Sequence, residues 1–248
     1  MASPRIKSSA RLPDFPRPLT TVDVAIFTVR EQQLHVLLVQ RPDTPGEPFP
    51  GLWALPGGFV DVDRDRDLVT CARRKLRDKT EVVSPYLEQL GSWGSRDRDP
   101  RGWSSTHVWF ALIPDTGTVH AGASVADAAD AAWYPVTGNG VKPKLAFDHR
   151  EILEAAIERL RSKVEYTSLP VYLLPGEFTM TELQRMFEIV LGRDVEKSAF
   201  RTRIFSADFV EPVPRMREGQ QRPAQLYRLK KSSELVFFPR TFSPRSGS

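Results

Sequence analysis

Residues 55–82, LPGGFVDVDRDRDLVTCARRKLRDKTEV, decide the fold because they join a glycine pair, an acid-rich loop and an amphipathic stretch. Apolar residues in the second half recur at i, i+3, i+4 and i+8, which is the pattern of a helix with one buried side. The aspartates of the loop precede this helix and favour the positive end of its dipole. We therefore predict a helix over about 65–79, with one buried stripe made of Leu68, Cys71, Ala72 and Leu76.

The polar face of this helix carries Lys75, Asp78 and Lys79, which are spaced i, i+3 and i+4 and so share one side. Three carboxylates there would offer the oxygen ligands that Mg²⁺ prefers. Two lysines and one aspartate instead give this face a net charge of +1, which repels a divalent cation. Two interpretations stay open: the ammonium groups meet the phosphates of a ligand directly, or the face is a solvated surface with internal ion pairs.

Strand-forming runs lie on both sides of this segment. Residues 22–29 and 34–39 are aliphatic runs separated by a short polar turn, and they predict a hairpin. Residues 41–51 are rich in Pro and Gly and predict a loop. Beyond the helix, three more runs predict strands at about 88–93, 106–113 and 131–134.

A second helix is expected over residues 148–165. Asp148 and Glu151 have the spacing of a capping box at its start. His149, just inside this start, is interpreted as structural, and the four histidines of the chain show no metal-ligand spacing. Because the helix precedes a change of composition, chain order makes it the natural element to transmit a signal between two domains.

The residues after 165 have the pattern of a winged helix-turn-helix. Residues 166–176 are expected to form a linker with strand character. A capping box of Thr179 and Glu182 begins a helix that Gly192 ends. A second helix over about 196–208 and a hairpin with a long basic tip, made of residues 210–213, 215–222 and 225–229, complete the pattern.

Composition and charge narrow the class of protein. The 248 residues are 40% hydrophobic and 27% charged, which is typical of a globular chain of one or two domains. The single cysteine, Cys71, excludes an internal disulfide, and no apolar run has the length of a membrane span, so we expect a soluble, cytoplasmic protein with no membrane partner. The net charge is +3 in residues 1–20, −3 in 21–165 and +4 in 166–248.

The basic C-terminal part offers candidates for contact with nucleic acid. A helix in the major groove needs donors for base edges and cations for phosphates, and a wing follows the backbone. Basic residues on a lone helix are usually only solvated, but here they coincide with helix-turn-helix spacing and a basic hairpin tip. The predicted DNA-binding residues are Lys197, Ser198, Arg201, Thr202, Arg203, Arg215, Arg217 and Arg222, with Arg5 and Lys7 of a flexible basic arm over residues 1–20.

A small anionic ligand is expected on the N-terminal part. Guanidinium groups pair well with phosphate oxygens, so the charged turn at residues 96–103 is a candidate beside the helix of residues 65–79. The alternative is a solvated hairpin loop. The predicted ligand-binding residues are Arg41, Arg74, Lys75, Asp78, Lys79, Arg98 and Arg101.

Residues 55–82 resemble the Nudix box, G-x5-E-x7-R-E-U-x-E-E-x-G-U, in which U is aliphatic. Gly57, Gly58, Arg74 and Leu76 keep their places, although two extra residues lie between Gly58 and Arg74. The three late glutamates of the box align with Lys75, Asp78 and Lys79, and its late glycine with Glu81. The scaffold of a diphosphate hydrolase is therefore present without its metal ligands.

The whole chain resembles the Nudix-related transcriptional regulators of NAD metabolism, the NrtR family. Besides the box, the resemblance rests on RDPRG, LAFDHREIL, FTMTELQRMFE and RPAQLYRL, which begin at residues 98, 145, 178 and 222. It implies an α+β fold, with an N-terminal Nudix-like α/β/α domain over residues 21–165 and a winged helix over 166–248. It also implies a homodimeric repressor that binds a double-stranded DNA operator, needs no cofactor and responds to a nucleotide such as ADP-ribose.

Two other functions remain open from the sequence. A Nudix-type hydrolase with an accessory domain would need unusual carboxylates, for which the nearby candidates are Asp61, Asp63, Asp65 and Glu81. An RNA-binding regulator would use the same basic surface. The missing glutamates favour a protein that is not an enzyme and that senses its ligand without destroying it.

Overall fold

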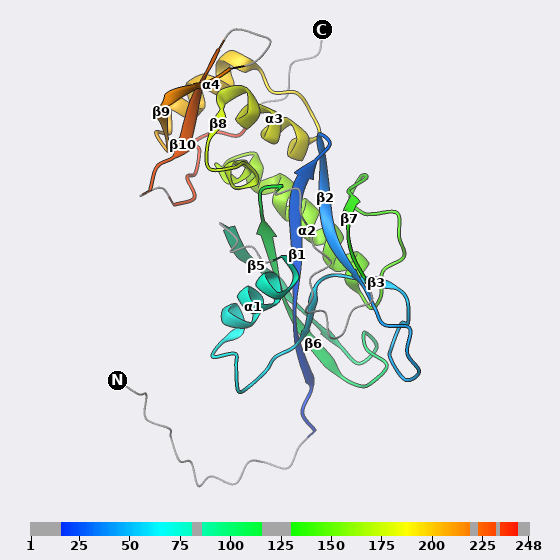
Figure 1. The fold of residues 1–248 in the computed structure, drawn as a ribbon. Coiled ribbons are helices and arrows are strands. Elements are labelled where there is room, and N and C mark those ends of the chain that lie inside the picture. Colours follow the sequence, from blue (N-terminus) through cyan, green and yellow to red (C-terminus); the bar gives the residue numbers. More distant parts are fainter. Residues whose placement is uncertain (1–15, 81–85, 116–129, 219–222, 232–233, 243–248) are drawn as a thin grey trace, which may run out of the picture.

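A computed structural model describes residues 16–80, 86–115, 130–218, 223–231 and 234–242; the side chain of Lys79 is outside this description. Figure 1 shows a sheet-containing N-terminal domain with a smaller C-terminal domain stacked on one end of it. The helix α2 runs between the two. No helix in the described ranges is long and apolar enough to cross a membrane.

The N-terminal domain is built on a seven-stranded sheet with the main order β3-β2-β1-β6-β5. The long strand β1 pairs in parallel with β6 and antiparallel with β2 and β4, while β7 pairs with β2. The hairpin and the three later strands predicted from the sequence are confirmed. The strands are β1 (Leu19–Arg30), β2 (Gln33–Gln40), β3 (Trp53–Ala54), β4 (Gly57–Phe59), β5 (Tyr86–Ser95), β6 (Ser104–Leu112) and β7 (Asp130–Pro135).

Two helices, α1 (Leu68–Thr80) and α2 (His149–Val164), pack on opposite faces of this sheet. Side chains along β1 alternate between the faces, as a strand with period two requires. Val22 and Val24 join the cluster that contains the apolar side of α1, whereas Ala25 and Phe27 join the cluster that contains α2. The predicted α/β/α arrangement is confirmed.

The C-terminal domain is a winged helix around buried Phe187 and Phe200. The predicted capping box is confirmed, because Thr179 and Glu182 exchange hydrogen bonds, and Gly192 ends the helix in the left-handed region at φ 68°. The elements are η1 (Leu169–Leu173), β8 (Phe178–Thr179), α3 (Met180–Leu191), α4 (Lys197–Ser206), β9 (Val210–Arg217) and β10 (Ala224–Leu229), and the sheet order is β8-β10-β9.

Two local predictions are wrong. The expected linker with strand character contains the 3₁₀ helix η1, whose residues Leu169, Val171 and Leu173 are buried in the core shared by both domains. Asp148 does not cap α2 with its side chain. The reason is that Arg98 takes the Asp148 carboxylate, while Glu151 accepts a hydrogen bond from the Trp93 indole at 3.1 Å. Both side chains therefore bond to residues far along the chain instead of to the backbone at the start of α2.

The two domains share one continuous apolar cluster and several polar contacts. On α2, Arg161 donates to the carbonyl of Val190 in α3 at 3.3 Å. On α3, Arg185 donates to the side chain of Gln32 at 2.9 Å, in the turn between β1 and β2. Arg161, Arg185 and Gln32 line an open cavity of about 360 Å³ between the domains. The domains are therefore joined by α2 and by the β1–β2 turn.

Candidate functional site

The glycine pair of residues 57–58 brings β4 against β1 and α1. A Cβ atom on Gly57 would collide with the carboxylate of Asp23. Gly58 has φ +139°, and a Cβ there would lie 2.8 Å from Nζ of Lys75. Glycine is therefore required twice, once for close approach and once for backbone conformation. The same geometry places the Lys75 ammonium directly against Gly58 of β4.

The predicted ligand residue Arg74 is held inside the domain by Asp65. Its Nε and Nη2 atoms donate to the two carboxylate oxygens at 2.7 and 2.5 Å, and the Asp65 side chain is fully buried. The backbone N–H of Asp61 also donates to Asp65, at 2.9 Å. The hydrogen bonds from Arg74, helped by this backbone donor, hold the pKa of Asp65 well below its usual value despite burial. This bidentate pair clamps the acidic loop onto α1.

Divalent metal does not fit the box helix. Lys75 brings an ammonium to Gly58 of β4, and the carboxylate of Asp78 lies 3.7 Å from Nη1 of Arg74. The described residues contain no group of three or more His, Cys, Asp or Glu side chains that could hold a metal ion. The side chain of Lys79, which belongs to the same face of α1, lies outside the described residues. The donor set therefore suits an anion better than a cation.

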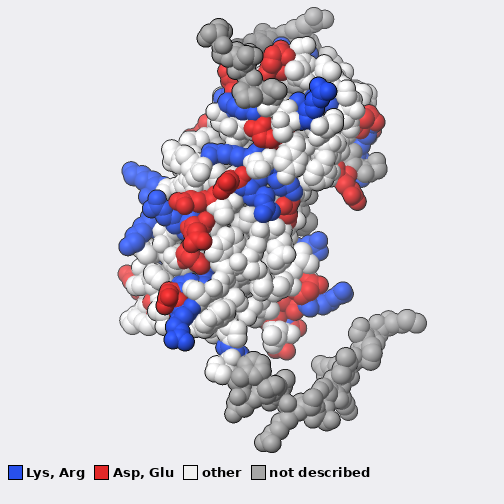
Figure 2. All heavy atoms as spheres, turned by 180° about the vertical axis from the view of Figure 1, so that it is seen from behind, with Lys and Arg blue, Asp and Glu red and all other residues white. Residues whose placement is uncertain are grey.

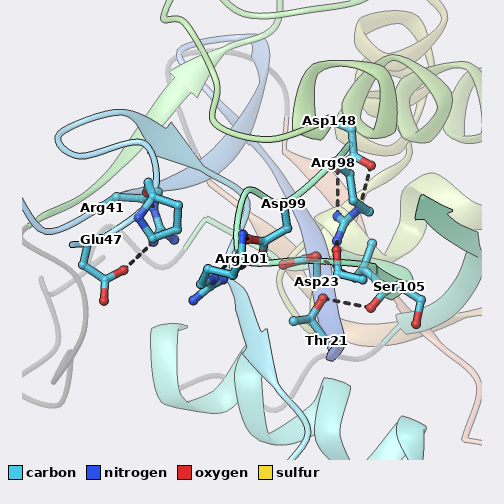
Figure 3. Close-up of polar contacts among 12 residues, drawn as sticks. Thr21, Asp23, Arg41, Glu47, Arg98, Asp99, Arg101, Ser105 and Asp148 are labelled. Carbon is cyan, nitrogen blue, oxygen red and sulfur yellow. Dashed lines mark hydrogen bonds and ion pairs between the residues drawn. The ribbon is translucent and has the colours of Figure 1, made fainter. Parts of the chain in front are cut away.

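Two further predicted ligand residues, Arg41 and Arg101, extend this positive region across the loops beside the sheet (Figure 3). Arg101 makes two hydrogen bonds to Asp99, at 3.0 and 2.8 Å, and its guanidinium lies 5.1 Å from the ring centre of Phe59. Arg41 donates to Glu47 at 2.7 Å and lies over Phe147. Burial lowers the pKa of Arg41, and the charge of Arg101 lowers it further. Each guanidinium is thus paired with a carboxylate of its own loop, Glu47 for Arg41 and Asp99 for Arg101.

Arg98 is placed differently from Arg101, although both come from the same turn. Its Nε and Nη2 atoms each donate to Asp148 at 2.8 Å, and Nη1 donates to Ser104 at 3.2 Å. Its side chain is only 5% exposed. Figure 3 shows it directed toward α2 and away from Arg41 and Arg101. Arg98 therefore ties the turn to the start of α2.

A buried polar group centred on Asp23 was missed by the sequence reasoning. Thr106 donates to Asp23 at 2.6 Å, and Nε2 of His149 lies 3.7 Å from the same carboxylate. The backbone N–H of Leu55 donates to Nδ1 of His149 at 2.9 Å, which positions the chain just before the glycine pair. Burial lowers the pKa of His149 although Asp23 opposes this effect. The available signal was an aspartate inside an apolar strand.

Cys71, predicted to be a packed thiol, is buried on the sheet side of α1. Burial raises the pKa of its thiol to about 12, because the thiolate would lose its solvation. It is therefore unreactive at neutral pH.

The candidate nucleic-acid interface is the outward side of α4. Glu196 caps this helix by accepting from the backbone of Ser198 and Ala199 at 2.9 and 2.6 Å. The predicted residues Lys197, Ser198, Arg201 and Thr202 are all exposed. Arg203 is not part of this surface: its guanidinium lies 3.9 Å from the ring centre of Phe242 and donates to the Thr241 carbonyl at 2.8 Å. Burial lowers the pKa of Arg203.

The predicted wing residues Arg215 and Arg217 are exposed and form ion pairs with Glu177 and Glu182, at the start of α3. Exposed ion pairs of this kind contribute about 0–1 kcal/mol, so phosphates can replace these carboxylates. Figure 2 shows basic and acidic side chains interspersed on the face it displays. The predicted residues Arg222, Arg5 and Lys7 lie outside the described residues.

The fold and these sites define a class: a Nudix domain with an altered box, joined to a winged helix. Family models agree, since the NUDIX domain matches residues 19–156 and the NrtR DNA-binding winged helix domain matches residues 170–229. The chain is 45% identical, over 92% of its length and 88% of the relative, to the ADPR responsive transcriptional repressor NtrR of Acinetobacter baylyi. The chain belongs to the NrtR family.

Solved structures of Shewanella oneidensis NrtR support the same assignment. The complex with a 27mer DNA matches at TM-score 0.80 and 41% identity, covering 90% of this chain and 99% of that one. The NUDIX domain of that protein complexed with ADP ribose matches at TM-score 0.52 and 42% identity, over 61% of this chain and 94% of that one. The likeness thus extends over both domains.

Proposed function

We propose that this protein is a transcriptional repressor. Its winged helix binds operator DNA, and its Nudix domain senses ADP-ribose without hydrolysing it. The observation that carries the proposal is the position of Lys75, whose ammonium lies against Gly58 of β4 and which aligns with a metal-binding glutamate of the Nudix box. The names of the relatives, a repressor responsive to ADP-ribose and an NrtR bound to DNA, support both halves of the proposal.

The diphosphate of the effector binds where the positive side chains converge. Lys75 lies beside Gly58, and the guanidinium of Arg101 lies over the ring of the next residue, Phe59. The ammonium of Lys75 can meet a phosphate directly. The guanidiniums of Arg41 and Arg101 can exchange their present partners, Glu47 and Asp99, for phosphate oxygens, with which guanidiniums pair well. Arg74 and Arg98 support the site indirectly. The pair of Arg74 with Asp65 holds the acidic loop on α1, and the pair of Arg98 with Asp148 holds the turn at residues 96–103 against the start of α2.

The repressor acts as a homodimer that presents two winged helices to half-sites spaced about 34 Å apart, one turn of DNA. Effector binding changes the relative placement of these two modules and releases the operator. The helix α2 and the β1–β2 turn transmit the change, because both contact α3. Since β2 leads directly to Arg41, this turn and the proposed ligand site are the two ends of one strand.

The alternative of a hydrolase that uses unusual carboxylates has little support in the described residues. Asp65 is committed to Arg74, and Asp61 accepts hydrogen bonds from the backbone of Asp63 and Arg64 at 3.1 and 3.2 Å. Glu81 lies outside the described residues. We therefore propose that the protein is not an enzyme.

The test compares two double variants of the full chain in calorimetric titrations with ADP-ribose. In Lys75→Ala/Lys79→Ala the cations of the box face are removed. We expect affinity to fall tenfold or more, because a hydrogen bond to a charged group contributes roughly 1.5–3 kcal/mol. The matched control is Arg73→Ala/Arg77→Ala, which removes the same charge from exposed positions of α1 and should bind normally. Unchanged binding by the first variant would contradict the proposed ligand site.

The same preparations test the repressor and the absence of hydrolysis. The wild-type protein should bind DNA from upstream of its own gene and release it when ADP-ribose is added. When the protein is incubated with Mg²⁺ and a panel of nucleotides that includes ADP-ribose, no product of diphosphate cleavage should form. Mg²⁺-dependent cleavage of ADP-ribose would favour the hydrolase, and preference for structured RNA over duplex DNA would favour an RNA-binding regulator.

A further inference from the structure

An exposed phenyl ring lies on the outward face of α4. Phe200 and Ile204 mark the buried side of this helix, and both are fully buried. Ser198, Thr202 and Phe205 lie on the opposite side, as the helical spacing of three to four residues requires. The Phe205 side chain is 49% exposed. The face therefore consists of two hydroxyl groups beside an aromatic ring, with Arg201 at its edge.

The ring of Phe205 is also held in place. Its centroid lies 5.9 Å from that of Tyr227 on β10, in a tilted arrangement. Tyr227 is half-buried and lies next to Leu226, which packs into the domain. A side chain that packs on one edge and stays open on the other is preorganised for a partner, because little further entropy is lost when the partner binds.

The chemistry of the major groove indicates what such a ring can recognise. Each base pair presents hydrogen-bond donors and acceptors there, and the one apolar group on the base edges is the C5 methyl of thymine. Hydroxyl groups such as those of Ser198 and Thr202 can pair with several bases, whereas a phenyl ring can only discriminate through apolar contact. A ring at this position would gain nothing from a cytosine amino group or a phosphate.

We propose that Phe205 is a specificity-determining residue that packs against a thymine methyl group in the operator. The inference rests on the proposed function, because it requires α4 to lie in the major groove. Burying one methyl group contributes about 0.8 kcal/mol, which is roughly a fourfold change in affinity. The contribution is small, but it applies in each half-site of a dimer.

The experiment deletes single methyl groups from the DNA. Full-length protein selects its preferred duplex from a random-sequence pool, and each thymine of that duplex is then replaced in turn by deoxyuridine, which differs only by the methyl. We expect wild-type affinity to fall about fourfold at one position per half-site. Phe205→Ala should bind the thymine and deoxyuridine duplexes equally, and Phe205→Leu should keep part of the preference. Phe237→Ala, which removes a 63% exposed ring elsewhere in the domain, should behave as wild type.

The outcomes separate this proposal from the proposed function. If wild type binds its selected duplex but no deoxyuridine substitution weakens binding, the methyl contact is wrong and the repressor stands. If Phe205→Ala weakens binding to both duplexes by the same factor and the wild-type methyl effect persists in it, the ring only supports the fold. If no sequence is enriched from the pool, the proposed function fails and the thymine contact fails with it.

Discussion

The helices α1 and α4 both carry basic residues for negatively charged partners, yet they hold them in opposite ways. On α1, Arg74 is bound by a fully buried carboxylate and Lys75 lies against Gly58 of β4. On α4, Lys197 and Arg201 are exposed and have no carboxylate partner among the described residues. A site for one small anion benefits from preorganised charges, whereas a DNA surface works with solvated cations that displace counterions from phosphates.

Each domain repeats this contrast between neighbouring arginines. Arg98 is buried on Asp148 while Arg101, three residues later, stays near the proposed ligand site. Arg203 packs on Phe242 while Arg201, two residues earlier, faces solvent. Local sequence makes all four look alike, but Arg98 and Arg203 contact groups far along the chain, whereas Arg101 pairs with Asp99 of its own turn and Arg201 is exposed.

The largest expected effect comes from breaking the Arg98–Asp148 pair. Arg98→Ala leaves Asp148 partly buried and unpaired at the start of α2, and removing one partner of a buried ion pair costs about 3–5 kcal/mol. We expect the free energy of unfolding in urea to fall by this amount. Arg150→Ala is the matched control, because its pair with Glu154 is exposed and should contribute less than about 1 kcal/mol. Normal stability combined with lost ADP-ribose binding would show instead that Arg98 contacts the ligand.

Arg201 and Arg203 offer the second comparison, within α4. Arg201→Ala should weaken operator binding on the order of tenfold at low salt. It should also reduce the slope of log affinity against log salt by about 2, because one phosphate contact is lost in each half-site of the dimer. Arg203→Ala should lower the free energy of unfolding through lost contact with Phe242 and leave the salt slope unchanged. Fluorescence anisotropy at several salt concentrations measures both slopes, and equal slopes in the two variants would remove the distinction.

The elements predictable from sequence were those set by local periodicity. The hairpin of residues 22–29 and 34–39, the stripe of Leu68, Cys71 and Leu76, and the Thr179–Glu182 capping box are short-range patterns, and each matches the structure. The Asp148–Glu151 box failed because both side chains have long-range partners. Ion pairs formed in the folded chain likewise decide which of the predicted ligand-binding residues face a ligand.

Burial decides which predicted site residues remain available. Arg41 and Arg101 pair with carboxylates of their own loops, Glu47 and Asp99. Arg74 pairs with the buried side chain of Asp65, and Arg98 with Asp148 at the start of α2. No periodicity reports such pairings, since they arise only when loops from different strands meet. Asp23 was missed for the same reason, because its partners Thr106 and His149 are far along the chain.

The contact between Arg185 and Gln32 tests whether the two domains communicate through the β1–β2 turn. Arg185→Ala leaves both proposed binding surfaces intact, so affinities for operator alone and for ADP-ribose alone should stay near the wild-type values. The factor by which ADP-ribose weakens operator binding should shrink by the equivalent of about 0.5–2 kcal/mol. Arg159→Ala, which removes an arginine of α2 that pairs with Glu88, is the control. An unchanged factor would leave α2 as the transmitting element.

The smallest expected effect concerns pH and the buried His149. Because burial lowers its pKa below 6.5, the unfolded chain binds a proton that the folded chain resists. The stability from neutral His149 is therefore fully present above pH 6.5 and is lost as pH falls from there through the lowered folded pKa.

His149→Asn keeps an acceptor for the Leu55 N–H but cannot titrate. We expect this variant to be less stable than wild type near neutral pH because it is smaller, yet to lose less stability on acidification to about pH 5. Thermal unfolding across this range measures the difference. The carboxylate held by Arg74 titrates below its ordinary pKa of 3.8 and so does not contribute in this window. Parallel losses in the two proteins would show that the proton is taken up elsewhere.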